Sequence, residues 1–283
     1  MKKNGFFSGA FIALVFLFLY APIAVLIAFS FNASKSSAVW MGFTTDWYVQ
    51  LFQDSYIMAA LRTTLLVSVL ATLIATIVGT AAAIGFHNMG RKARTACLTV
   101  NNIPLTNADI ITGVSMMLLF VAAFGAFNAT LGEVLGFRLR LGFGTLLIAH
   151  ITFDIPYVIL SVMPKLRQLD PNIAEAAQDL GATNFYAFRK VILPEILPGV
   201  VNGMLIAFTM SIDDFVISYF TAGSRSNTLS MVVYSMVRRQ ISPKINALST
   251  IMFVAVLALL IIINLRQTRQ EAARRRKRAA LRP

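Results

Sequence analysis

The chain has 283 residues, of which 57% are hydrophobic and 13% are charged, and its mean hydropathy is +0.72. This composition predicts an all-α membrane protein with several spans and excludes a soluble globular domain. The formal net charge of +13 can also indicate nucleic-acid binding, but in a membrane protein the positive-inside rule explains it better.

Catalytic and metal chemistry have little support in the sequence. The single cysteine, Cys97, excludes an intramolecular disulfide and a cysteine-cluster metal site, and two histidines are too few for a histidine metal centre without carboxylates. No phosphate-binding G-x-x-x-x-G-K-[ST] loop occurs, and no nucleophile–base pair is recognisable. We therefore predict no catalytic residue, no metal and no cofactor bound by this chain.

Six apolar segments are long enough to cross a membrane as helices. The expected spans of this single transmembrane domain, 1–283, cover about residues 6–31, 61–86, 96–124, 144–163, 199–220 and 247–265. The first span follows Lys2 and Lys3, which also resemble the start of a signal peptide. Its apolar run is longer than the apolar part of such peptides, so we expect it to stay in the membrane.

The third expected span has a polar centre, NNIPLTNADIITG, over residues 101–113. Its amides and carboxylate would be costly against lipid, and Pro104 removes a backbone hydrogen bond. A broken helix that lines a cavity explains these features together. Asp109 is expected either to face that cavity or to cap the second half of the helix.

Carboxylates recur inside the expected spans, at Asp109, Asp154, Asp213 and Asp214. Since a carboxylate among lipid tails costs about 2.5–3.5 kcal/mol on insertion scales, such residues usually face a cavity and mark a pathway. Their alternative role is to cap broken helices or to pair with a partner subunit. Adjacent positions of a helix point about 100° apart, so Asp213 and Asp214 cannot both face the same point.

Aromatic side chains accompany these carboxylates and favour a cationic solute. Tyr157, Phe215 and Tyr219 can hold ammonium groups by cation–π contact, and no lysine or arginine lies in the central part of any expected span. A pathway for an oxyanion would instead need arginines or backbone N–H groups there. His150, near Asp154, is expected to be a hydrogen-bonded structural residue.

The longest polar interruption runs over residues 164–198 and predicts two short helices joined at a glycine. Gly181 suits the left-handed stop of the first helix. The second helix, whose cap is Thr183 or Asn184, is expected to end at Leu193-Pro194, because proline cannot continue the helical hydrogen-bond ladder.

The distribution of basic residues predicts the orientation of the chain. Most of the 25 lysines and arginines lie in the termini and in the loops on the same side, which include the stretch 164–198. Both termini and this stretch are therefore expected in the cytosol. The basic tail, 266–283, is most simply an anchor to anionic lipid headgroups, and nucleic-acid binding by it has no further support.

The stretch 164–198 resembles the EAA loop of bacterial ABC importer permeases, which docks a coupling helix into a separate ATPase subunit. The residues that carry this resemblance are Glu175, Ala176, Ala177, Gly181, Leu193 and Pro194. Four further segments look like the second permease of spermidine/putrescine importers, the PotC and PotI type. They are GFTTDWY (42–48), HITFDIPYV (150–158), SIDDFVISYFTAG (211–223) and YSMVRRQISPKINALST (234–250). The chain departs from these relatives at Asp154, where they carry an uncharged residue.

This resemblance implies a polyamine permease of a type I importer, which works by alternating access in the bacterial cytoplasmic membrane. The implied partners are a homologous second permease in a heterodimer, two ATPase subunits that hold ATP and Mg, an extracytoplasmic substrate-binding protein and membrane lipid, with no nucleic acid. The alternatives are a permease for another solute, such as ferric iron, an amino-acid derivative or an oxyanion, and a channel or sensor outside this family.

Overall fold

A computed structural model describes residues 5–34, 39–170, 172–224, 226–239 and 243–280. Apart from an isolated bridge between Asn32 and Phe43, every regular element in these ranges is a helix, which confirms the prediction of an all-α protein. Contacts within the chain group the residues into two units, 1–58 with 233–283 and 59–232, and each is described by itself.

The first unit holds α1 (Gly5–Phe29), α2 (Asp46–Gln53) and α12 (Pro243–Ala280), with the start of α3 and the end of α11 (Leu229–Arg239). α12 packs against both α1 and α2. No part of the apolar stretch of α1 is buried within the described chain. Such a helix suits surroundings of lipid or of a partner chain.

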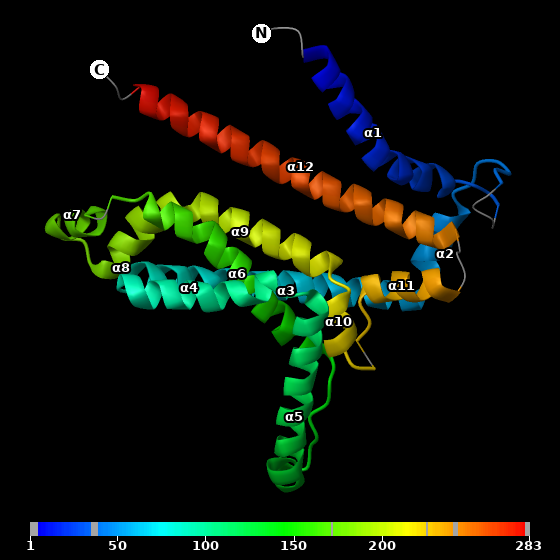
Figure 1. Ribbon diagram of the computed structural model, residues 1–283, viewed down its shortest axis with the longest axis horizontal. Coiled ribbons are helices and arrows are strands. Elements are labelled where there is room, and N and C mark those ends of the chain that lie inside the picture. Colours follow the sequence, from blue (N-terminus) through cyan, green and yellow to red (C-terminus); the bar gives the residue numbers. More distant parts are fainter. Residues whose placement is uncertain (1–4, 35–38, 171, 225, 240–242, 281–283) are drawn as a thin grey trace. The chain divides into compact units, whose positions relative to one another are not determined.

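The second unit holds the helices that position the candidate site (Figure 1). They are α3 (Ser55–Asn88), α4 (Arg91–Thr106), α5 (Asp109–Leu135), α6 (Phe143–Arg167), α7 (Ile173–Asp179), α8 (Asn184–Ala187), the π-helical turn η1 (Phe188–Ile192), α9 (Leu193–Asp213) and α10 (Val216–Thr221). α6 and α9 pack along one another, and α10 packs against α5 and α6. In Figure 1, α5 points away from the α6–α9 pair.

Small residues bring α3 and α9 close to α6. A Cβ atom on Gly79 of α3 would lie 2.8 Å from the Val158 Cβ of α6, and one on Gly203 of α9 would lie 3.0 Å from the Val158 Cα. Both distances are too short for a larger side chain, so these glycines set the separation of the helices. Val158 is fully buried in the apolar core that results, together with Val162 and Ile196.

Five described helices are long and apolar enough to cross a membrane, namely Gly9–Phe29, Ser55–Asn88, Asp109–Gly132, Phe143–Arg167 and Asn184–Asp213. The sixth expected span, 247–265, lies within α12. The apolar part of α12 among the described residues, Pro243–Ala258, is shorter than these five. A sixth span therefore stays a prediction.

The third expected span is broken where its polar residues predict a break. α4 ends at Thr106 and α5 begins at Asp109. Of the two helices, only α5 is long and apolar enough to cross a membrane, over Asp109–Gly132, so the bounds 96–124 stay a prediction. The polar residues 101–106 lie in α4 and Asn107 lies at the break, before the apolar stretch of α5.

The second helix of the polar stretch does not end at Leu193-Pro194 as predicted. α8, η1 and α9 form one continuous helical segment, Asn184–Asp213. The Leu193 N–H donates to the Phe188 carbonyl five residues earlier, so a π-helical turn precedes the proline. Pro194 then stands in the first turn of α9, where its missing N–H is tolerated. The helix itself ends at Asp213, within the expected span 199–220.

Candidate functional site

The break between α9 and α10 gives two adjacent carboxylates different surroundings. Asp213 is the last residue of α9 and is exposed, whereas only 8% of the Asp214 side chain is exposed. One carboxylate oxygen of Asp214 accepts the Ser218 N–H over 2.7 Å, and the other accepts the Ile217 N–H over 3.2 Å. Asp214 therefore caps the start of α10, while Asp213 stays exposed at the end of α9.

His150 connects α6 to both helices at this break. Its Nδ1 atom lies 2.7 Å from the Ser211 hydroxyl of α9, and its Nε2 atom lies 3.0 Å from the Ser218 hydroxyl of α10. Nε2 also lies 3.6 Å from a carboxylate oxygen of Asp214. Because the residue is buried and both ring nitrogens have partners, the expectation of a hydrogen-bonded structural histidine is confirmed.

Asp154 lies one helical turn after His150 and is fully buried in α6. Neither of its carboxylate oxygens has a hydrogen-bond partner among the described residues. It lies inside the helix packing, whereas Asp109 and Asp213 are exposed. An ionised Asp154 therefore needs a positive partner that the described side chains do not supply.

The remaining acidic and aromatic candidates lie on α5 and α10. Asp109 is in the first turn of α5, where a carboxylate interacts favourably with the helix dipole. The cap position is Ala108 and no side-chain cap bond is made, so the expected alternative role of Asp109 as a cap was wrong. The rings of Phe215 and Tyr219 lie 5.6 Å apart, and Tyr219 is exposed.

Five of the predicted pathway residues lie close enough to interact electrostatically. Asp109 and Asp154 both act on Tyr157, and Asp214 acts on Asp154 and on Asp213. An apolar cluster built from α5, α6 and α10 packs against the Tyr157 ring. The fold thus brings carboxylates from three separate spans into one region, which we call the acidic cluster.

The polar stretch between α6 and α9 bends at Gly181, as predicted. Its φ is +86°, in the left-handed region that glycine adopts without strain. Before it, α7 carries Glu175 and Ala176 at exposed positions. After it, the Thr183 hydroxyl accepts the Tyr186 N–H over 3.3 Å and caps α8. Two short helices therefore meet at the glycine.

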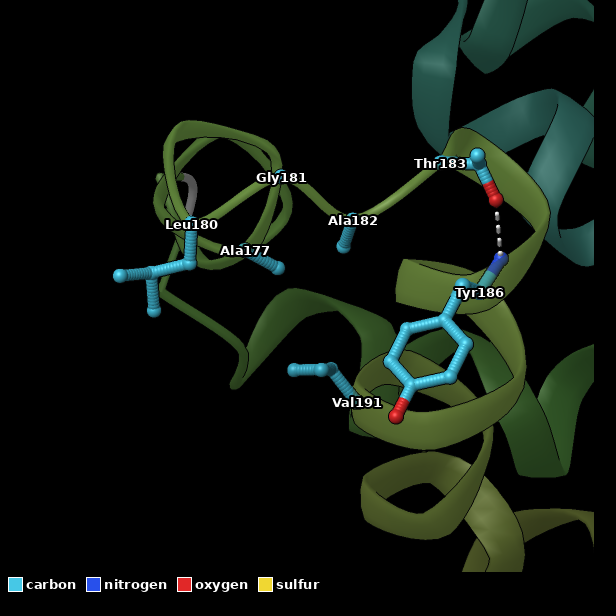
Figure 2. A pocket seen from close by; sticks show the side chains of 7 residues that line it. All are labelled: Ala177, Leu180, Gly181, Ala182, Thr183, Tyr186 and Val191. Atoms are coloured by element: carbon cyan, nitrogen blue, oxygen red, sulfur yellow. Dashed lines mark hydrogen bonds between the residues drawn. The ribbon is translucent and has the colours of Figure 1, made fainter.

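Between these two helices lies an open pocket of about 420 Å³ (Figure 2). Its lining residues are Ala177, Leu180, Gly181, Ala182, Thr183, Tyr186 and Val191. Most of this lining is apolar, and the Leu180 side chain is 90% exposed. This apolar surface is open to a partner protein. Sequence reasoning identified the glycine and the alanines but missed Leu180 and Tyr186, which belong to no recognised motif.

Residues 75–276 match the family described as "Binding-protein-dependent transport system inner membrane component". The chain belongs to this family. The matched region contains both the acidic cluster and the pocket at Gly181. The protein is therefore a multi-pass inner-membrane permease of a binding-protein-dependent ABC transporter, and the predicted resemblance to ABC importer permeases is confirmed.

Curated relatives match this permease along most of its length. It is 40% identical over 242 residues to the putrescine transport system permease protein PotI of Escherichia coli K12, covering 85% of this chain and 83% of the relative. It is 36% identical over 260 residues to the spermidine/putrescine transport system permease protein PotC of Haemophilus influenzae, covering 92% and 96%. The predicted resemblance to the PotC and PotI type is thereby confirmed.

Solved structures with the same fold share less sequence. A chain of a bacterial ABC transporter involved in the import of alginate matches with a TM-score of 0.69 and 20% identity, covering 95% of this chain and 96% of that chain. A chain of the MetNI methionine ABC transporter in an inward-facing conformation matches with a TM-score of 0.55 and 19% identity, covering 85% and 100%. At these identities the likeness establishes the permease fold alone.

Proposed function

We propose that this permease moves polyamines such as putrescine and spermidine across the bacterial cytoplasmic membrane by alternating access, driven by ATP hydrolysis on partner subunits. The observation that carries the proposal is the identity of 36–40% over most of the chain to permeases named for putrescine and spermidine transport. The chemistry of the acidic cluster supports the same class of solute.

A polyamine carries several ammonium groups on a flexible apolar chain. Asp109 and Asp213 are exposed and can replace the hydration that an ammonium group loses in the membrane. Among the described residues, Lys244 pairs with Asp54, and the His150 ring lies near Asp214, so neither Asp109 nor Asp213 is neutralised within that part of the chain.

Aromatic and inner acidic residues complete the pathway. The exposed ring of Tyr219, beside Phe215, offers a face that attracts a cation. Tyr157 and Asp214 lie further inside and contribute a ring and a carboxylate to the same region, and Asp154 is buried behind them.

The permease works within a larger assembly. A homologous second permease forms a heterodimer with this chain, an extracytoplasmic substrate-binding protein delivers the polyamine, and two ATPase subunits hold ATP and Mg. The family description, which names binding-protein-dependent transport, supports this arrangement. Both termini lie in the cytosol, and the basic tail 266–283 contacts anionic lipid headgroups.

The polar stretch around Gly181 transmits ATP hydrolysis to the spans. The ATPase surface fits against the apolar pocket, where Ala176 and Ala177 permit close approach and Glu175 offers a charged contact. The unbroken helix through Leu193-Pro194 then carries a displacement of this stretch into the span that ends at Asp213.

Uptake of radiolabelled putrescine tests the proposed solute. The permease and its partners are expressed in cells that lack their own polyamine importers, and unlabelled solutes compete for uptake. We expect competition by spermidine but not by ferric citrate, amino acids or sulfate. If the cells take up one of these other solutes in labelled form but no putrescine or spermidine, the importer class would stand and the polyamine assignment would be removed.

A single substitution tests the acidic cluster in the same assay. Asp213→Asn should lower uptake by about tenfold or more, because a contact with a charged group is worth about 1.5–3 kcal/mol. Asp46→Asn, which changes an exposed carboxylate on α2, is the matched control and should transport normally. Equal uptake by both variants would exclude Asp213 from the pathway.

A further inference from the structure

The contacts between α3 and α6 show which residues of α3 lie at the level of Asp154. The two helices run in the same direction, because their beginnings cluster together and their ends cluster together. Gly79 meets Val158 directly. On α3, Ala75 and Thr76 lie one turn before Gly79. On α6, Asp154 lies one turn before Val158. Ala75 and Asp154 are both fully buried.

The opposite wall comes from α9, which runs in the reverse direction. Gly203 packs against Val158, and Ser211 is hydrogen-bonded to His150. Midway between these two contacts lie Ala207 on α9 and Asp154 on α6. Ala207 is also fully buried. Asp154 is therefore enclosed between two helices that present alanines at its level.

Unpaired hydroxyls lie along the α3 wall of this space. Four buried residues, spaced by one turn each, have side-chain oxygens without a partner among the described residues: Ser68, Thr72, Thr76 and Thr80. Thr72 and Thr76 flank Ala75, the position level with Asp154. Two unpaired carboxylate oxygens thus lie at the level of two unpaired hydroxyls, which is an oxygen-only set of candidate ligands.

The groups around Asp154 supply no positive charge. His150, one turn away, already has Ser211 and Ser218 as partners, and Asp214 acts on Asp154 with a negative charge. Among the described residues that the helix register places at this level, α3 has Thr72, Ala75 and Thr76, and α9 has Ala207. A buried carboxylate without a counter-charge is too costly to persist in the ionised form.

We propose that Asp154, with Thr72 and Thr76, forms a buried site for one small monovalent cation, a proton or Na⁺. The cation neutralises the carboxylate and stabilises the packing of α3, α6 and α9. Because Asp154 is fully buried and the register places alanines at its level, we assign this position to a small cation and not to a polyamine. The inference does not depend on the solute that the permease carries.

Thermal unfolding of the assembled transporter in nanodiscs tests the site. Unfolding is followed by the reaction of a thiol reagent with Cys97, the single cysteine of this chain. This residue lies on α4, which packs against α6. The partner subunits are made cysteine-free so that only Cys97 reacts. In one arm Na⁺ replaces choline at constant ionic strength at about pH 8. In the other arm the pH is lowered without Na⁺. The variants are Asp154→Asn and the exposed control Asp46→Asn.

In at least one arm the cation should raise the unfolding midpoint of the wild type and of Asp46→Asn by a few degrees. A rise with Na⁺ identifies Na⁺ as the ligand, and a rise with acid alone identifies a proton. Asp154→Asn should show neither rise and should be at least as stable as the cation-free wild type. Because this variant keeps His150, an acid effect through that residue would appear in it too.

Three outcomes would overturn the proposal. The wild type would respond in neither arm, Asp154→Asn would keep the full response, or Asp154→Asn would be destabilised under every condition. None of these readouts requires a solute, so failure of the polyamine assignment would leave this test intact.

Discussion

His150 is the residue through which α6 holds the break between α9 and α10. Its two nitrogens bind one hydroxyl on each side of the break, at 2.7 and 3.0 Å. The Ser230 hydroxyl, which donates to the Asp214 carbonyl over 2.8 Å, fixes the backbone of the break further. A neutral imidazole suits this position because one nitrogen donates and the other accepts.

His150→Phe keeps a ring of similar size and removes both hydrogen bonds. We expect a lower unfolding midpoint and reduced transport, because each buried group left unpaired costs about 1–3 kcal/mol. Thr152→Ala is the matched control, since it removes an exposed hydroxyl of α6 that bonds only the backbone of its own helix. Unchanged stability and transport in His150→Phe would show that the break holds without this residue.

The sequence located the carboxylates within the apolar runs but did not predict how each is placed. Asp109, Asp154, Asp213 and Asp214 are recognisable because charged residues are rare in apolar runs. Whether each is buried depends on which side of its helix meets a neighbour. In helices that are apolar on all sides, periodicity does not reveal that side. The burial of Asp154 and the exposure of Asp213 therefore required the structure.

At the scale of elements, the second half of the polar stretch and the span after it form one continuous helix. A turn at Gly181 joins α7 to α8, and the helix from Asn184 to Asp213 then continues through the π-helical turn. The sequence predicted the turn at Gly181, because glycine is the residue that most often takes the left-handed conformation after a helix. It did not predict the continuation past Pro194, since a π-helical turn has no such signature.

Gly181→Val should leave the permease inserted but weaken its association with the ATPase and reduce transport. A β-branched residue is strained at a φ of +86°, so the angle between α7 and α8 should change. Gly181→Asn is the control, because asparagine tolerates the left-handed region better. Co-purification of the ATPase and uptake report the two effects. Wild-type values in the valine variant would separate Gly181 from coupling.

At the scale of the whole molecule, two spans have almost no cover from the described chain. The apolar stretch of α1 is 0% buried and that of α5 is 6% buried. In a membrane, lipid or a partner chain covers such surfaces. The described chain therefore leaves the surfaces of these two spans to lipid or to a partner chain.

ATP-dependent uptake into proteoliposomes tests this account most directly. The purified permease is reconstituted with its partner permease and ATPase subunits, and the binding protein and labelled putrescine are added outside. The account predicts that putrescine accumulates against its gradient, only when ATP is enclosed and the binding protein is present. ATP hydrolysis by the intact assembly without accumulation of putrescine or spermidine would contradict it.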